Sequence, residues 1–151
     1  MTVNSQIATV AAAIANLSIS GVTMRDIDEI PDSAALLCPL MLPQPDNFVT
    51  ALTFSRESFG SMGAAKMNTS YTLNYAYLHC EVGSGLNTYA SYAGIISKLE
   101  LILETIMTND VITGAVDIQV ESVGNIGVIP DPAGVQYWGL LFSFRILEYT
   151  Q

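Results

Sequence analysis

Basic residues are scarce in this sequence, which has five lysines and arginines against fourteen aspartates and glutamates and a formal net charge of −9. A protein that holds DNA or RNA by its phosphates needs the opposite balance. The composition therefore fits an ordinary acidic domain, or a surface that faces DNA without retaining it. Charged residues of both signs make up 13% of the chain, about half the usual share. We expect partners to cover some of its apolar surface.

Residues that commonly carry catalysis or bind metals are equally few, with one histidine, His79, and two cysteines, Cys38 and Cys80. Neighbours on a strand point to opposite faces, so His79 and Cys80 cannot form a catalytic pair or ligate one metal together. One chain then lacks the ligands of a zinc site, and no Gly-x-Ser-x-Gly motif is present. We expect no enzyme, metal or cofactor. The cysteines should be buried thiols, able to pair only if their strands are adjacent.

Long hydrophobic runs are also missing, since no segment approaches the ~18 apolar residues of a membrane span. A secretory signal would require a basic residue near its start, but no lysine or arginine precedes Arg25. The 151 residues suit a single domain, and no linker or repeat divides them. We expect one domain, residues 1–151, made in the cytoplasm and kept there or in a particle assembled there, with no membrane partner.

Two segments show the three-and-four spacing of apolar residues that predicts an amphipathic helix. The first covers residues 2–17, and its apolar stripe is Val3, Ile7, Val10, Ile14 and Leu17. The second covers residues 87–108, and its stripe is Tyr89, Tyr92, Ile96, Leu99, Leu103 and Ile106. Alternating strand patterns lie on both sides of the second helix, so we expect it to cover a sheet.

Alternation of apolar and polar residues predicts strands at residues 48–54, 67–82, 116–123 and 137–149. Residues 22–30 and 36–42 are weaker candidates, and Pro39 should confine the second to an edge or a bulge. Strands joined by direct loops pair antiparallel, while a helical crossover allows a parallel pair. The expected fold class is α+β, a mostly antiparallel sheet with both helices on one face and two long β-hairpin arms.

The connections at residues 55–66 and 124–134 are long and contain apolar residues, which favours contact with another molecule. The candidate subunit contacts are Phe59 and Met62 in the first connection and Ile126, Val128 and Ile129 in the second. In the final strand, Arg145 could pair across the ladder with Asp117 or Glu121.

The densest acidic cluster consists of Asp26, Asp28, Glu29 and Asp32. A calcium loop would need a ligand where Ile30 stands and glycine where Pro31 stands, so that motif fails. The cluster is then a solvated edge. If symmetry repeated it around a channel, it would also repel a passing polyanion. In a ring with such a channel, these residues would be the candidate lumen surface.

A glycine-containing turn at residues 83–88 lies between a predicted strand and a predicted helix, where a phosphate-binding loop would belong. It begins with Gly83, Ser84 and Gly85, but Thr88 occupies the third glycine position. A flexible turn with Asn87 or Thr88 as the helix N-cap is the simpler interpretation. A small-molecule-binding domain at residues 83–88 remains the alternative from another functional class.

The order of these segments resembles the tail-terminator (tail-completion) and neck proteins of long-tailed bacteriophages. The similar features are the N-terminal helix before a short strand, the acidic stretch at residues 25–32, and the proline-bounded residues 36–43. They also include the arm before the strand at residues 71–82, the helix at residues 89–107, and the closing hairpin of residues 116–123 and 137–149. That hairpin contains Tyr137, Trp138, Gly139 and Leu140 in succession.

The resemblance implies a structural virion protein that forms a homo-oligomeric ring, usually a hexamer. The ring would cap the head-proximal end of the tail tube, stop tube polymerisation and join the tail to the head. Its partners would be the tail tube protein, a head-tail connector or stopper protein, and a sheath protein if the tail contracts. DNA would pass through as cargo. A head-closure (stopper) ring or another neck subunit is the alternative within this class.

Overall fold

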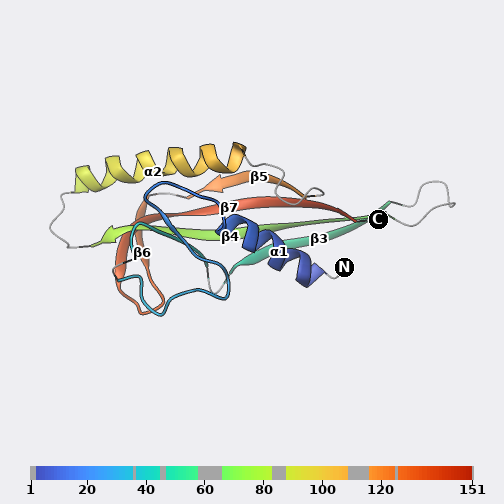
Figure 1. Cartoon of the computed structure of the whole chain (residues 1–151), viewed down its shortest axis with the longest axis horizontal. Coiled ribbons are helices and arrows are strands. Elements are labelled where there is room, and N and C mark those ends of the chain that lie inside the picture. Colours follow the sequence, from blue (N-terminus) through green and yellow to red (C-terminus); the bar gives the residue numbers. More distant parts are fainter. Residues whose placement is uncertain are drawn as a thin grey trace.

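The computed structural model describes residues 3–35, 37–44, 47–57, 66–82, 88–108, 116–124 and 126–150. It confirms the α+β class, with both predicted helices and a mostly antiparallel sheet (Figure 1). The elements in chain order are α1 (Val3–Ala15), β1 (Thr23–Met24), β2 (Leu40–Pro43), β3 (Val49–Glu57), β4 (Lys66–Glu81), α2 (Thr88–Thr108), β5 (Val116–Val123), β6 (Gly127–Pro130) and β7 (Gln136–Thr150).

The two longest strands, β4 and β7, form the centre of the sheet. They pair antiparallel from Met67 opposite Thr150 to Glu81 opposite Tyr137. Along the other side of β4 lie β2 at one end and β3 at the other. Along the other side of β7 lie β5 and then β6. The sheet therefore has a two-strand core with β2 and β3 on one flank and β5 and β6 on the other, and β1 lies outside β2.

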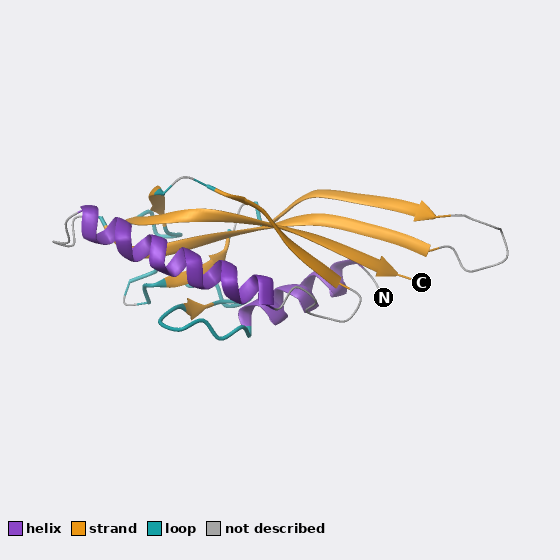
Figure 2. Cartoon of the chain, turned by 90° about the horizontal axis from the view of Figure 1, so that it is seen from above, coloured by secondary structure: helices purple, strands orange, loops and turns teal. Residues whose placement is uncertain are grey.

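Both predicted hairpins are present. The β3–β4 ladder runs to Glu57 opposite Lys66, and this end of the sheet reaches past both helices (Figure 2). The second hairpin is more regular than its sequence suggested, because β6 continues the pairing with β7 after a short break in which Gly124 N donates to Leu141 O at 2.7 Å. The tip of the first hairpin, with Phe59 and Met62, lies outside the described residues.

The weak strand predicted at residues 36–42 does not occupy the edge position that Pro39 suggested. We expected an edge or a bulge, but β2 starts only at Leu40 and lies between β1 and β4. Pro39 has no N–H to donate, yet its carbonyl accepts from Thr23 N at 2.8 Å. The expectation of antiparallel pairing for directly connected strands was wrong here, since β1 and β2 run parallel. The connection between them is long enough to return the chain in the same direction.

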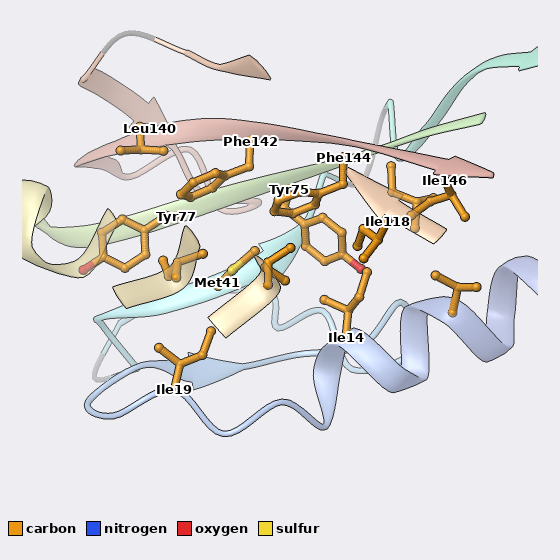
Figure 3. Close-up of a cluster of buried hydrophobic side chains, with 14 of the residues drawn as sticks. Ile14, Ile19, Met41, Tyr75, Tyr77, Ile118, Leu140, Phe142, Phe144 and Ile146 are labelled. Atoms are coloured by element: carbon orange, nitrogen blue, oxygen red, sulfur yellow. The ribbon is translucent and has the colours of Figure 1, made fainter. Parts of the chain in front are cut away.

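Both helices pack on one face of the sheet, which we call the helix face. Figure 3 shows part of its buried side chains, with Ile14 of α1 near the side chains of the strands. Alternation along β4 and β7 directs every second large side chain to this face, and each such buried side chain contributes about 1.5–3 kcal/mol by leaving water. The buried residues are Tyr71, Leu73, Tyr75 and Tyr77 of β4, Leu140, Phe142, Phe144 and Ile146 of β7, Val10 and Ile14 of α1, and Ile95, Ile102 and Ile106 of α2.

The buried stripe of α2 differs from the predicted one. Ile106 is buried as expected, but Ile96 is 38% exposed while its neighbour Ile95 is buried. Leu99 and Leu103 are only partly buried, and Ile102 lies between them in the core. Adjacent apolar residues allow two stripes about 100° apart on the helix, and packing against the sheet selects one of them.

Candidate functional site

The face of the sheet opposite the helices, here called the open face, carries a ladder of polar side chains over β3, β4 and β7. Thr53 Oγ1 and Ser70 Oγ are 2.6 Å apart, and Arg145 Nη2 donates to the same Ser70 oxygen at 2.8 Å. Asn74 Nδ2 donates to Thr50 Oγ1 at 2.9 Å, and Ser143 Oγ donates to Asn74 Oδ1 at 2.7 Å. Such cross-strand pairs fix strand register.

The ladder extends to β5, where Thr72 Oγ1 donates to Glu121 Oε2 at 2.7 Å. The expected pairing of Arg145 with Asp117 or Glu121 is therefore wrong. The register places Gln119 opposite Arg145, and a bulge between Val120 and Ser122 shifts Glu121 out of step. Arg145 finds Ser70 on the other side instead. Uncharged hydroxyl and amide groups thus dominate this part of the open face.

At its other end the open face is covered by the β1–β2 connection, which packs over a second small core. This core contains Ala34, Leu40, Leu42, Ala76, Leu78 and Tyr137, with Ile129 packed against it. Asp131 fastens the cover, because its Oδ2 accepts from Ala34 N and its Oδ1 from Val135 N, both at 2.9 Å. Asp131 is 6% exposed. Sequence reasoning missed it, although an aspartate between Pro130 and Pro132 is a turn signal.

A groove of about 560 Å³ lies beside this cover, lined mainly by Leu42, Ala76, Leu78, Ile129 and Leu141. Small-molecule sites combine such apolar walls with a few polar groups placed to bind the ligand. The carboxylate of Asp131 also lines the groove, but both of its oxygens already accept backbone hydrogen bonds. Gln44 and Asn47 also line the groove, so its walls combine apolar surface with two uncharged polar residues.

The three predicted contact residues of the second connection differ in their exposure to solvent. Ile126 packs against the main core and Ile129 against the small one, and both side chains are partly buried. Val128, between them, is 45% exposed. Alternation along β6 explains the division. Val128 is thus the described member of the predicted contact set that faces solvent.

The predicted lumen residues lie together in the connection between β1 and β2. Asp26 Oδ1 accepts from Ile27 N at 2.7 Å, and Glu29 Oε1 accepts from Asp26 N at 3.3 Å. These bonds form a local turn. Asp28, Glu29 and Asp32 are exposed and Asp26 is partly buried. The cluster is therefore solvent-facing, as either interpretation of it requires.

His79 has a structural environment. Its Nδ1 is 2.7 Å from the Tyr77 hydroxyl, and a Cβ at Gly94 of α2 would lie 2.8 Å from its Nε2. Burial lowers the pKa of His79, and nearby Lys98 lowers it further. Lys98 Nζ donates to Ser20 O at 2.9 Å. His79 therefore marks a close approach between α2 and the sheet, and Lys98 ties α2 to the segment after α1.

The sheet ends in β3 on one side and β5 on the other, and neither has a second strand partner within the described ranges. Leu52 of β3 is 43% exposed, and Gln119 of β5 is exposed. A bulge at residues 50–53 holds Ala51 at a φ of 52° and interrupts the β3 edge. Regular pairing continues over residues 53–57 of β3 and 116–120 of β5. These two segments are the longest edges available for strand addition, since β1 and β6, which also have one strand partner each, pair over only two and four residues.

The chain matches no protein-family model and no curated protein sequence. Among the described residues, no group of three or more histidine, cysteine, aspartate or glutamate side chains could hold a metal ion. No helix in the described part of the chain is both long and apolar enough to cross a membrane. Residues 83–87 of the predicted glycine turn lie outside the described ranges, and α2 begins at Thr88.

Proposed function

We propose that this protein is a structural subunit that assembles head-to-tail with copies of itself into a closed ring. Within that class we propose a tail terminator of a long-tailed bacteriophage, which caps the tail tube at its head-proximal end. The assignment to a tail terminator comes from the order of the sequence segments described above. A head-closure ring occupies a neighbouring position in the same kind of particle, and locating the subunit in electron-microscopic density would separate the two.

The observation that carries the ring proposal is the pair of sheet edges. β3 is antiparallel to β4, β4 to β7, and β7 to β5. It follows that β3 and β5 run in opposite directions. If the sheet of one copy continued into the next, β5 of one subunit would meet β3 of its neighbour in antiparallel orientation, the more stable pairing. Because the two edges differ, such a contact is heterologous, and a rotation that closes it gives a ring.

Surface composition is in keeping with this role. Low charge together with exposed Leu52 and Val128 leaves apolar surface for a neighbouring subunit or the tail tube to cover. The solvent-facing acidic cluster of Asp26, Asp28, Glu29 and Asp32 would repel DNA if the ring placed it around the channel. Phe59 and Met62, in the arm between β3 and β4, are the further contact candidates.

The test uses one charged substitution on each edge, since lysine on an edge strand discourages pairing. Leu52→Lys places a lysine in the bulge directly before the regular segment of the β3 edge, and Gln119→Lys places one within the regular segment of the β5 edge. Val135→Lys, at an exposed position in the turn after β6, is the matched control. Mass in solution is measured by light scattering after size exclusion, with circular dichroism to verify folding and negative-stain microscopy to detect rings.

A head-to-tail contact makes a distinctive prediction for mixtures. Each edge variant alone should remain a monomer, while an equimolar mixture should give 1:1 dimers, because each variant keeps the edge that the other lacks. The control should form rings like the parent chain. Rings from both edge variants, or a parent that stays monomeric at high concentration, would reject the proposal. A thermal shift with nucleotide would favour the small-molecule alternative instead.

A further inference from the structure

A groove follows the outer edge of β5, where no strand within the described residues pairs with it. The groove holds about 560 Å³ and is lined by Ile106 and Met107 at the end of α2 and by residues 117–120 of β5 (Figure 1). Met107 is 70% exposed, while Ile118 is buried in the main core and Val120 packs against that core. A strand added at this edge would therefore find backbone hydrogen-bonding groups and an apolar groove in the same place.

The β3 edge of a second copy can meet this edge only with matching faces, because directly opposed residues of antiparallel strands point to the same side of the sheet. Thr53 points to the open face, since its Oγ1 lies 2.6 Å from Ser70 Oγ. Gln119 points to the same face, because it lies opposite Arg145, whose guanidinium also donates to Ser70. Thr53 of one copy can therefore lie opposite Gln119 of the next, or opposite a residue two positions before or after it.

The lengths and charges of the two edges favour one of these three registers. The regular segments are residues 53–57 of β3 and 116–120 of β5. Thr53 opposite Asp117 would pair only residues 53 and 54 with residues 117 and 116. Thr53 opposite Glu121 would place it at the β5 bulge and set Glu57 opposite Asp117, and two acidic residues directly opposed destabilise a sheet. Thr53 opposite Gln119 pairs residues 53–56 with residues 119–116 and opposes no like charges.

We infer that β3 of one copy lies in the β5 groove of the next with Thr53 opposite Gln119, an inference that rests on the ring proposed above. This register sets Phe54 opposite Ile118, so an aromatic residue of the neighbour meets the apolar part of the groove. The neighbouring strand also covers Met107. On the other side of the sheet, Thr53 and Gln119 extend the polar ladder of the open face from one copy into the next. The groove thus takes a second copy of this chain, held in one register.

Cysteine cross-linking tests the register, because a disulfide requires Cα atoms about 4.4–6.8 Å apart. Cys38 and Cys80, which are free thiols in the structure, are first replaced by alanine in the full-length chain. Thr53→Cys is then combined with Gln119→Cys, with Asp117→Cys or with Glu121→Cys, and each assembled variant is oxidised with copper phenanthroline. Within one copy, residues 53 and 119 lie on opposite edges of the sheet, three strand spacings or about 14 Å apart. A disulfide between them must therefore join two copies.

We expect covalently linked oligomers for the pair of residues 53 and 119, with the linked peptides identified by mass spectrometry, and little linkage for the other two pairs. A second measurement needs no cysteine. Met107→Ser should raise the protein concentration at which rings assemble about tenfold, because less apolar surface is buried in the contact. Val135→Ser, at an exposed position in the turn after β6, is the matched control and should leave that concentration unchanged.

The inference is overturned if rings form but cross-link only through residue 117 or 121, or if they stay unlinked in all three pairs. It is also overturned if Met107→Ser assembles at the same concentration as the parent chain. In each of these cases the rings themselves are still observed, so the proposed function survives. A parent chain that stays monomeric rejects the ring and this register together, and the two kinds of failure are therefore distinguishable.

Discussion

Two tyrosines on the same face of β4 should respond in opposite directions to the same substitution. Tyr75 is 1% exposed, and its hydroxyl has no hydrogen-bond partner among the described groups. A buried polar group without a partner costs about 1–3 kcal/mol. Tyr75→Phe removes the hydroxyl and keeps the ring, whose centroid lies 5.4 Å from that of Phe48 and 5.6 Å from that of Phe144. We expect stabilisation by about 1 kcal/mol.

Tyr71 is the matched comparison, because its hydroxyl donates to the carboxylate of Glu148. Glu148 is itself 2% exposed, so Tyr71→Phe would leave a buried carboxyl group without this donor. Hydrogen bonds to charged groups contribute about 1.5–3 kcal/mol. We expect Tyr71→Phe to destabilise the fold by about 2 kcal/mol.

The assay is equilibrium urea unfolding of the parent and both variants, followed by circular dichroism and compared at a common slope. The midpoint should rise for Tyr75→Phe and fall for Tyr71→Phe. Two shifts of the same sign, or a loss of more than about 1 kcal/mol in Tyr75→Phe, which is the scale of the expected gain, would refute the reasoning. Either result would mean that packing around the rings outweighs hydrogen bonding at their hydroxyls.

Three further predictions rest on single residues. Burial raises the pKa of Glu148 above its ordinary value of 4.5, so the folded state holds this proton more tightly. Stability should therefore fall as pH rises between the unfolded and folded pKa values of Glu148. Glu148→Gln should flatten this decline in unfolding experiments across the same pH window. A Cβ at Gly139 would overlap the Tyr77 carbonyl oxygen, whereas a Cβ at Gly127 on the facing strand would meet open space. Thermal unfolding should therefore show that Gly139→Ala lowers the free energy of unfolding by about 3 kcal/mol and that Gly127→Ala lowers it much less. Ala51 has a left-handed φ of 52°, so Ala51→Gly should be neutral or stabilise by up to ~1 kcal/mol, and a clear loss in urea unfolding would contradict the strain.

Much of the fold could be predicted because it depends on local patterns. Alternation along residues 67–82 and 137–149 predicted the two central strands, and it also identified the side chains that face the helices. Helical spacing predicted α1 and α2 to within two residues at each end. The candidate site was less predictable. The partial burial of Ile126 and Ile129 against the two cores could not be predicted, because nothing in a short apolar run tells which side the rest of the sheet occupies.

The sequence by itself determined the α+β class, the two helices, the main strands and the acidic character, because these follow from residue spacing and composition within each segment. Only the tertiary structure decided the parallel β1–β2 pair, the buried stripe of α2 and the clamp formed by Asp131. Each of these depends on which distant segments become neighbours. That choice is made by the packing of the whole chain, where the sum of many small contacts selects one register among several that local patterns allow.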